Sequence, residues 1–223
     1  MSLTVTKVDY FTGIDIGQVA DSTAYAVIER HRAVADLENL HEGWHDRAKK
    51  EARETPTRLD LVWADRIPLG VPYPAQVEIL RDVLLRPQLR GCAVYLDATG
   101  VGLGPYQMLK QAGIRNMHGI KITGSTGPAK QTPDGWNVGK LELVSALQIE
   151  MQTGRLRIGS RIPHAATLVR ELKEFRSRQN ASGHLTFNAR EGQHDDLVLA
   201  LSYAVFGALR PTPVTNFPIR WAA

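Results

Sequence analysis

Hydrophobic and polar residues alternate along the first third of the chain in a way that predicts β-strands. Residues 13–16 and 23–28 are short apolar or β-branched runs that are expected to pair as a hairpin. Residues 59–67 carry hydrophobic side chains at alternate positions and predict a third strand, which ends before a loop containing Pro and Gly. The chain is therefore expected to begin with an antiparallel strand meander.

From residue 74 onward, helical and extended patterns take turns. Hydrophobic positions three or four residues apart predict helices, and short apolar runs between them predict strands. Such alternation is typical of parallel strands joined by helices. The sequence therefore predicts an α/β fold with a mixed sheet, in which an antiparallel meander is followed by parallel strands and helices flank the sheet. The helices are expected at residues 74–85, 105–111, 138–152, 165–175 and 195–209, and the strands at 92–96, 114–122, 155–158 and 184–187.

Two segments fall outside this pattern. A Pro-containing tail begins at about residue 211, and a charged insertion occupies about residues 32–58. The insertion is expected to form a helix that covers the domain, and the alternative is an arm that docks a partner through Trp44. With both segments included, residues 1–223 are expected to form a single domain. The helical face of the insertion would carry Val34, Leu37, His41, Trp44 and Ala48.

Composition narrows the class of protein. At 223 residues with 43% hydrophobic content, the chain is large enough for one sizeable α/β core. Its single cysteine, Cys92, excludes an internal disulfide framework and fits a reducing compartment. No apolar stretch approaches the ~20 residues of a membrane span, and the N-terminus lacks the pattern of a signal peptide. The expected location is the cytoplasm, without membrane contact.

Three short segments place aspartates at the edge of a hydrophobic element. Asp15 lies within the first predicted strand, Asp97 follows a later one, and Asp195 and Asp196 open the last helix. A carboxylate in such a place is costly to bury unless a cation or hydrogen bonds compensate it. If the two strands are neighbours, their acids can converge at the sheet edge, where the helix start closes the site. Close carboxylates repel one another, and a site with only oxygen ligands favours Mg²⁺ or Mn²⁺.

This set of acids predicts phosphodiester hydrolysis with two ions. Two such cations roughly 3.5–4 Å apart activate a water and stabilise the departing 3′ oxygen. Neighbouring residues on a helix point about 100° apart, so Asp195 and Asp196 cannot face one ion equally. Asp196 is favoured as the ligand beside Asp15 and Asp97, while Asp195 suits an N-cap or a group behind the ligands. His194 is a candidate for positioning a water or touching DNA.

Basic residues gather before the last helix. Residues 155–190 contain eight Arg or Lys against two Glu, whereas the whole chain, with 27 Lys and Arg against 23 Asp and Glu, carries a net charge of only +4. A surface of that sign attracts phosphates through counterion release, without reading sequence. Arg176 and Arg178, in an expected hairpin, are the main candidates for DNA contact, and Lys140 is a further one.

Four segments carry a family resemblance: residues 13–17 (GIDIG), 96–102 (LDATGVG), 154–158 (GRLRI) and 192–200 (GQHDDLVLA). In this order they resemble the C-terminal nuclease domain of phage terminase large subunits, which has an RNase H-like (RuvC-like) fold. The resemblance implies metal-dependent endonuclease cleavage of double-stranded DNA during viral genome packaging. It implies that Asp15, Asp97 and Asp196 or Asp195 are the ligands. The implied partners are the packaging ATPase domain, a small terminase subunit and the portal, in the cytoplasm of a bacterial host.

Other functions stay open at this point. The sequence has no GxxxxGK[S/T] phosphate loop, so ATP-driven translocation is not expected of this chain. An ATPase of the actin and sugar-kinase type would use residues 15–17 with Ser22 and Thr23 as a phosphate-binding hairpin. A Holliday-junction resolvase would share the acids and differ in substrate. A DNA-docking module would keep the fold without the metal.

Overall fold

Within the described part of the chain, the strands form one eight-stranded mixed sheet and a separate two-stranded hairpin. The computed structural model describes residues 3–17, 21–55, 57–179, 185–188 and 195–210, and for residues 176–179 and 185–188 it describes the backbone only. The strand order in the sheet is β6-β7-β5-β4-β1-β2-β3-β8, and β9 pairs with β10 in the hairpin. The strands are β1 (Thr4–Asp15), β2 (Thr23–Ala35), β3 (Arg58–Ile67), β4 (Ala93–Asp97), β5 (Met117–Thr123), β6 (Lys130–Thr132), β7 (Gly135–Gly139), β8 (Leu156–Ile158), β9 (Arg176–Gln179) and β10 (Leu185–Asn188).

Helices connect most of these strands. The connection through α3 joins the parallel neighbours β4 and β5, as expected of a strand–helix–strand unit, whereas α1 lies between the antiparallel neighbours β2 and β3. The helices are α1 (His45–Glu54), α2 (Tyr73–Leu84), α3 (Leu103–Gln111), α4 (Lys140–Gln152), α5 (Ala165–Glu174) and α6 (Asp196–Ala208), with short 3₁₀ turns η1 (Glu42–Trp44) and η2 (Gly100–Gly102).

The direction of the strands confirms the predicted mixed sheet. β1, β2 and β3 pair antiparallel in sequence order, which is the expected meander. β4 then pairs parallel with β1, and β5 and β7 continue the parallel part. Because β3 also runs parallel to β1, the carboxyl ends of β1, β3 and β4 lie at the same edge of the sheet.

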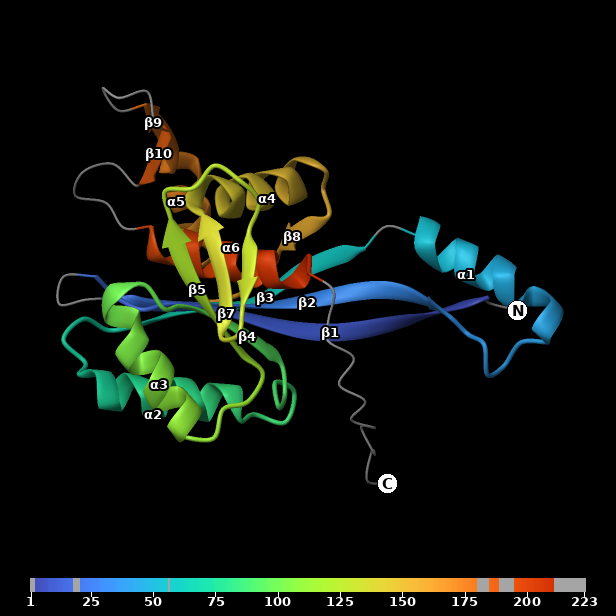
Figure 1. Cartoon of the computed structure of the whole chain (residues 1–223), viewed down its shortest axis with the longest axis horizontal. Coiled ribbons are helices and arrows are strands. Elements are labelled where there is room, and N and C mark those ends of the chain that lie inside the picture. The colour runs from blue at the N-terminus through green and yellow to red at the C-terminus, as the bar shows by residue number, and fades with distance from the viewer. Residues whose placement is uncertain (1–2, 18–20, 56, 180–184, 189–194, 211–223) are drawn as a thin grey trace.

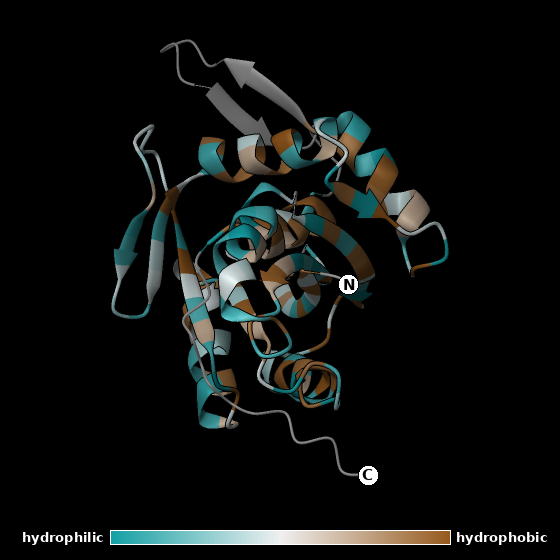
Figure 2. Ribbon diagram, turned by 90° about the vertical axis from the view of Figure 1, so that its right-hand side faces the viewer, coloured by the Kyte–Doolittle hydropathy of each residue, from teal (hydrophilic) through white to brown (hydrophobic). Residues whose placement is uncertain are grey.

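Helices cover both faces of the sheet (Figure 1). α2 and α3 lie on one face, whereas α6 lies against the other face and has α4 and α5 outside it. Neighbouring residues of β2 serve the two faces in turn, since Ile28 joins the core under α6 and Val27 joins the core under α2. Figure 2 shows the outer helices with both hydrophilic and hydrophobic segments, as expected of helices with one buried side.

The central helix α6 lies between the sheet and the outer helices. All 13 of its residues are buried, which is typical of a helix that is hydrophobic on every side. It passes so close to β1 that a Cβ added at Gly13 would lie 1.9 Å from the carbonyl oxygen of Ala200 and 2.5 Å from the backbone nitrogen of Ala204. A residue without a side chain is therefore required at position 13.

A buried arginine holds the far end of this helix. Arg30 of β2 is 4% exposed, and its Nη1 donates hydrogen bonds to the carbonyl oxygens of Ala208 at 2.7 Å and Arg210 at 3.3 Å. Its Nη2 donates to Asp9 at 2.9 Å. A cation at a helix C-terminus satisfies free carbonyls and opposes the negative end of the helix dipole. The C-terminus of α6 is thus fixed on β2, with its N-terminus at the edge where β1 ends.

The first two strands are longer than the sequence predicted. β1 begins at Thr4 rather than at residue 13, and β2 continues to Ala35, with Thr4 paired to Ala35. Residues 4–10 of β1 are exposed or only partly buried, so the outer half of the strand has no buried face and no hydrophobic alternation. Figure 1 shows this half of the β1–β2 pair extending beyond the other helices towards α1.

The charged insertion also differs from the prediction, because β2 extends into it. Residues 32–35 belong to β2, and the predicted covering helix is limited to α1. Of the five residues expected on its face, only Ala48 is buried, and Trp44 is 47% exposed with Arg47 stacked over its ring. The partner-docking alternative stays a prediction. The helix expected at residues 138–152 begins at Lys140, because Val138 belongs to β7, a strand that the sequence analysis missed together with β6.

Replacing Gly13 with alanine tests the close contact between β1 and α6. The added methyl group would collide with helix backbone that cannot move independently, so Gly13→Ala is expected to lower the free energy of unfolding by about 3 kcal/mol. Urea denaturation followed by circular dichroism measures this change. Gly104→Ala is the matched control, because an added Cβ there meets nothing within 4 Å and alanine favours the helix. Equal losses in the two variants would contradict the close contact.

Candidate metal centre

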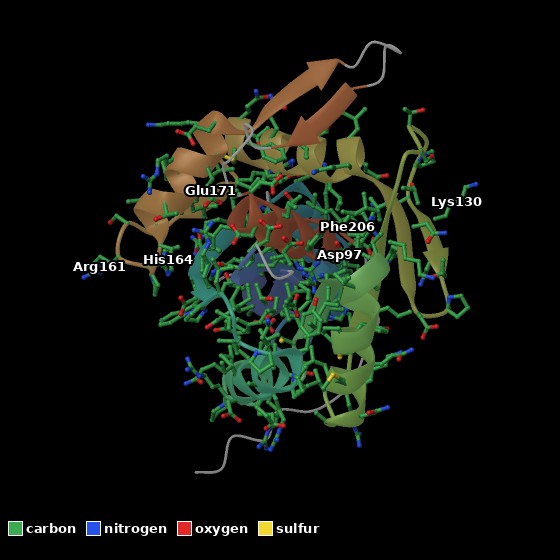
Figure 3. All side chains as sticks on the ribbon, turned by 90° about the vertical axis from the view of Figure 1, so that its left-hand side faces the viewer. Asp97, Lys130, Arg161, His164, Glu171 and Phe206 are labelled. Carbon is green, nitrogen blue, oxygen red and sulfur yellow. The ribbon has the colours of Figure 1, made fainter. Side chains whose placement is uncertain are left out.

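The two strand acids end neighbouring parallel strands. Asp15 is the last residue of β1 and Asp97 the last residue of β4, and the register pairs Ile14 with Leu96 directly before them. Neighbouring strands lie about 4.8 Å apart, so the two carboxylates start from adjacent points of one edge. Figure 3 looks towards this edge, with Asp97 near the middle of the view and Glu171 and Lys130 on opposite sides of it.

Asp15 lies in a field of other carboxylates. Burial raises the pKa of Asp15 well above its usual value, and Asp97, Asp195 and Asp196 raise it further, in this order. The positive charge of Lys140 opposes these effects. The three other predicted acids are therefore close enough to Asp15 to raise its pKa, and Lys140 is close enough to lower it.

Asp97 is held by the turn that follows its strand. The backbone N–H of Thr99 donates to Asp97 Oδ1 at 2.7 Å, and the Thr99 hydroxyl accepts from the backbone N–H of Ile122 at 2.9 Å. Burial raises the pKa of Asp97, while hydrogen bonds from Thr99, the charge of Lys140 and a hydrogen bond from Tyr203 act in the opposite direction. The side chain of Asp97 is thereby oriented by β4, β5 and α6 together.

Tyr203 is a member of this site that the sequence analysis missed. It is 0% exposed, and its hydroxyl donates to Asp15 Oδ1 at 3.4 Å. It follows Asp196 by seven residues, which places both on one side of α6 two turns apart. That spacing could have identified Tyr203 from the sequence, but a tyrosine in so hydrophobic a helix is first interpreted as a core residue.

The two acids at the start of α6 have different surroundings. Asp195 occupies the N-cap position, but its side chain makes no capping hydrogen bond, contrary to the expected role. Its Oδ2 lies 3.8 Å from Lys140 Nζ, and its side chain is 25% exposed. Asp196 is 3% exposed and forms an ion pair with Arg66 Nη2 through Oδ1.

Arg66 links Asp196 of α6 to a residue of α5. Near the end of β3, its Nη2 also forms an ion pair with Glu171 Oε1 of α5. Burial raises the pKa of Glu171 to about 7, which Arg66 opposes and Asp196 reinforces. Two nearly buried carboxylates thus depend on one arginine. We name Arg66, Glu171 and Asp196 the Arg66 clamp, and the sequence analysis missed its first two members because no local pattern marks them.

The four acids do not form one compact three-ligand sphere. Among the described residues, the trio of potential ligands whose atoms lie within 4.8 Å of one another is Glu29, His31 and Asp60, in the half of β2 and β3 away from Asp15. A single ion held simultaneously by three acids of the β1–β4 edge is therefore not the arrangement present. Two ions roughly 3.5–4 Å apart can each be bound by a different subset of the carboxylates, so that no three of the acids need to surround one ion. The all-oxygen donor set, whose negative charge is only partly compensated by Lys140 and Arg66, fits divalent cations.

The remaining predicted residues are placed less completely. Lys140 starts α4 beside the acids rather than on a distant surface, and its side chain is 25% exposed. Arg176 begins β9 and Arg178 is two residues further along the same strand, with only their backbone described. His194 lies outside the described residues.

The comparison with protein families decides the relationship. The model of the terminase RNaseH-like domain family matches residues 76–207, more than half of the chain and a stretch that includes Asp97, Asp195 and Asp196. The chain belongs to this family. No curated protein matches the sequence. Asp15 lies before the matched residues, so its assignment rests on the strand pairing, on the hydrogen bond from Tyr203 and on the effects of the other acids on its pKa.

Solved structures of phage terminase nucleases share the fold. The large terminase nuclease of thermophilic phage G20c with bound magnesium matches with a TM-score of 0.59 and 23% identity over 90% of this chain and 82% of that one. The same nuclease with bound cobalt gives 0.56 and 21%, over 90% and 81%. The nuclease domain of Thermus phage P74-26 gives 0.57 and 21%, over 88% and 78%. The RNase H-like fold is thereby confirmed. Separately, a search of the described helices finds none with the length and hydrophobicity to cross a membrane.

Removing the arginine of the Arg66 clamp tests how far it supports the site. Arg66→Ala leaves Asp196 and Glu171 nearly buried with no opposing charge, so the free energy of unfolding at neutral pH should fall by about 3 kcal/mol. Arg81→Ala is the control, because Arg81 pairs with the exposed Glu78 on α2 and its loss should cost no more than about 1 kcal/mol. Chemical denaturation of both variants measures the difference. Similar small losses in both would contradict the claim that the Arg66 clamp stabilises the buried carboxylates.

Proposed function

We propose that this chain is a metal-dependent endonuclease that cuts double-stranded DNA during phage genome packaging, with two Mg²⁺ or Mn²⁺ ions. The observation that carries the proposal is the grouping of Asp15, Asp97 and Asp195 with Lys140 at one edge of a terminase-family RNase H-like fold. Membership of the family and the likeness to phage terminase nucleases support the nuclease and packaging roles. The ions would activate a water and stabilise the departing 3′ oxygen at the scissile phosphodiester.

The ligands that we propose are Asp15, Asp97 and Asp195. Asp15 would serve both ions, because both Asp97 at the end of β4 and the acids at the start of α6 act on its pKa. Asp195 is favoured over Asp196 because the Arg66 clamp already compensates one oxygen of Asp196, whereas Asp195 has the larger effect on the pKa of Asp15. This reverses the preference from the sequence. Asp196 would orient the start of α6. Its Oδ2 has no hydrogen-bond partner among the described residues, so Asp196 is still a candidate metal ligand.

Lys140 would act on the substrate side of the same site. Its charge stabilises the ionised forms of Asp15 and Asp97, and its ammonium group lies 3.8 Å from Asp195. A lysine in that position limits repulsion between the acids before ions bind. When DNA enters, it can contact a non-bridging oxygen of the scissile phosphate. Lys140 thus keeps the phosphate contact predicted from the sequence, and that contact would be made at the metal centre.

The wider setting follows from the family. We propose that the nuclease acts beside a packaging ATPase domain, with a small terminase subunit and the portal as partners, in the cytoplasm of a bacterial host. Residues 1–223 would form one nuclease domain. Electrostatic attraction of DNA by Arg176 and Arg178 would place the duplex across the edge that holds the acids, and His194 would position a water or contact the DNA.

Substitution of the acids, assayed by plasmid cutting with Mg²⁺, Mn²⁺ or EDTA, tests the proposed function. The wild-type chain should produce linear DNA with a divalent ion and none with EDTA. Asp97→Asn should reduce the cutting rate by at least about 100-fold, because a ligand and its charge are lost. Asp46→Asn, on the exposed side of α1, is the control and should cut at the wild-type rate.

The same assay separates the two acids of α6. Asp195→Asn should raise the Mn²⁺ concentration needed for half-maximal cutting more than Asp196→Asn does, and Asp196→Asn should lower stability instead. The opposite order would return Asp196 to the ligand set. Full cutting by Asp97→Asn, or by the wild type in EDTA, would contradict the metal mechanism. A preference for four-way junctions over linear duplex would favour a resolvase.

A second test addresses the DNA surface. Positions 176 and 178 are alternate positions of β9, and alternate positions of a strand belong to the same face. Replacing both with glutamine should weaken binding of unrelated duplex sequences alike and reduce the slope of log K against log salt concentration by about 2. Lys49→Gln with Arg53→Gln, on α1, removes equal charge as a control. An unchanged slope in the hairpin variant would place the duplex elsewhere.

A further inference from the structure

Tyr203 directs its hydroxyl at acids from a helix that otherwise contributes hydrophobic core. It is 0% exposed, within a helix whose residues are all buried. A buried tyrosine hydroxyl usually has a hydrogen-bond partner, because leaving one unpaired costs free energy. The partner here is a carboxylate, since the hydroxyl donates to Asp15 Oδ1 at 3.4 Å, and Tyr203 also lowers the pKa of the neighbouring Asp97.

We propose that Tyr203 is a positioning residue for the metal centre, whose hydroxyl sets the orientation of the Asp15 and Asp97 carboxylates so that divalent cations bind between them. This inference rests on the proposed function, and it deepens it by assigning a role to a residue that does not touch an ion or the DNA. Groups that orient ligands in this way commonly affect metal affinity as much as some ligands do.

The geometry explains why a hydroxyl is suited to this place. The two carboxylates end neighbouring strands and repel each other, and a neutral donor between them offsets part of that repulsion without taking the place of a cation. A tyrosine hydroxyl is protonated at neutral pH and can therefore donate a hydrogen bond. Donation to Oδ1 of Asp15 leaves Oδ2 of the same carboxylate for an ion.

The position of Tyr203 also connects the site to the core. Its backbone belongs to α6, which is fixed on β1 by the contact at Gly13 and on β2 by Arg30. The hydroxyl is therefore held at a constant place relative to the ends of β1 and β4. A lysine or a water in this position would have more freedom, since neither is fixed by an aromatic ring packed in the core.

The test is Tyr203→Phe, which removes the hydroxyl and keeps the ring. Calorimetric titration with Mn²⁺ in the absence of DNA should give a dissociation constant about 10- to 100-fold higher than that of the wild type. In plasmid cutting, the Mn²⁺ concentration for half-maximal rate should rise by a similar factor. At saturating Mn²⁺, the rate should recover towards the wild-type value, because the ligands themselves remain.

Tyr106→Phe is the matched control. Tyr106 is 4% exposed, and its hydroxyl donates to the backbone carbonyl oxygen of Asp134 at 3.0 Å rather than to a carboxylate of the site. This variant should lose a similar buried hydrogen bond and keep the wild-type affinity for Mn²⁺. Thermal unfolding in EDTA checks that both variants are folded. Should Tyr203→Phe not fold, Tyr203→Met removes the hydroxyl with a side chain that adapts to the space.

The outcomes separate this inference from the proposed function. If the wild-type chain binds no Mn²⁺ and cuts no DNA, the proposed function fails, and the inference fails with it. If the wild type binds Mn²⁺ and Tyr203→Phe binds it equally well, only the inference is overturned, and Tyr203 is a core residue. An equal loss of affinity in Tyr106→Phe would likewise assign the effect to general destabilisation.

Discussion

The contact between α6 and β1 at Gly13 is the constraint on which the rest of the site depends. Backbone approaches backbone there, since even a methyl group would come within 1.9 Å of a helix carbonyl. Arg30 holds the other end of the helix on β2. With both contacts made, the start of α6 lies at the edge where β1 and β4 end. The position of Asp195, Asp196 and Tyr203 relative to Asp15 and Asp97 follows from this packing.

The packing produces an electrostatic cost that is only partly offset. Three other carboxylates act on Asp15, whereas Lys140 is the cation that lowers the pKa of both Asp15 and Asp97. The Arg66 clamp compensates Asp196 and leaves Asp195 beside Lys140. Like charges held together destabilise a protein in the absence of counter-charge and become favourable when divalent cations bind. A functional site that lowers the stability of the fold in this way is an example of the trade-off between stability and activity.

Much of the architecture could be predicted from the sequence, because its parallel half is covered by helices and keeps a clear pattern. The strand that ends at Asp97 and the helix that starts at Asp196 were found within one residue of their observed bounds. The outer half of β1 was missed, since residues 4–10 have no fully buried face to mark them. β6 and β7 were missed because they are three and five residues long and lack a hydrophobic run. Tyr203, Arg66 and Glu171 could not be assigned, because each acts through a neighbour that only the folded chain brings near.

Locating manganese in crystals of this protein would test the central claim most directly. Anomalous diffraction from crystals soaked in Mn²⁺ shows each bound ion independently of any assumption about ligands. We predict two peaks roughly 3.5–4 Å apart, from ions bound by Asp15, Asp97 and Asp195. Manganese found only beside Glu29, His31 and Asp60, with none at the ends of β1 and β4, would contradict it.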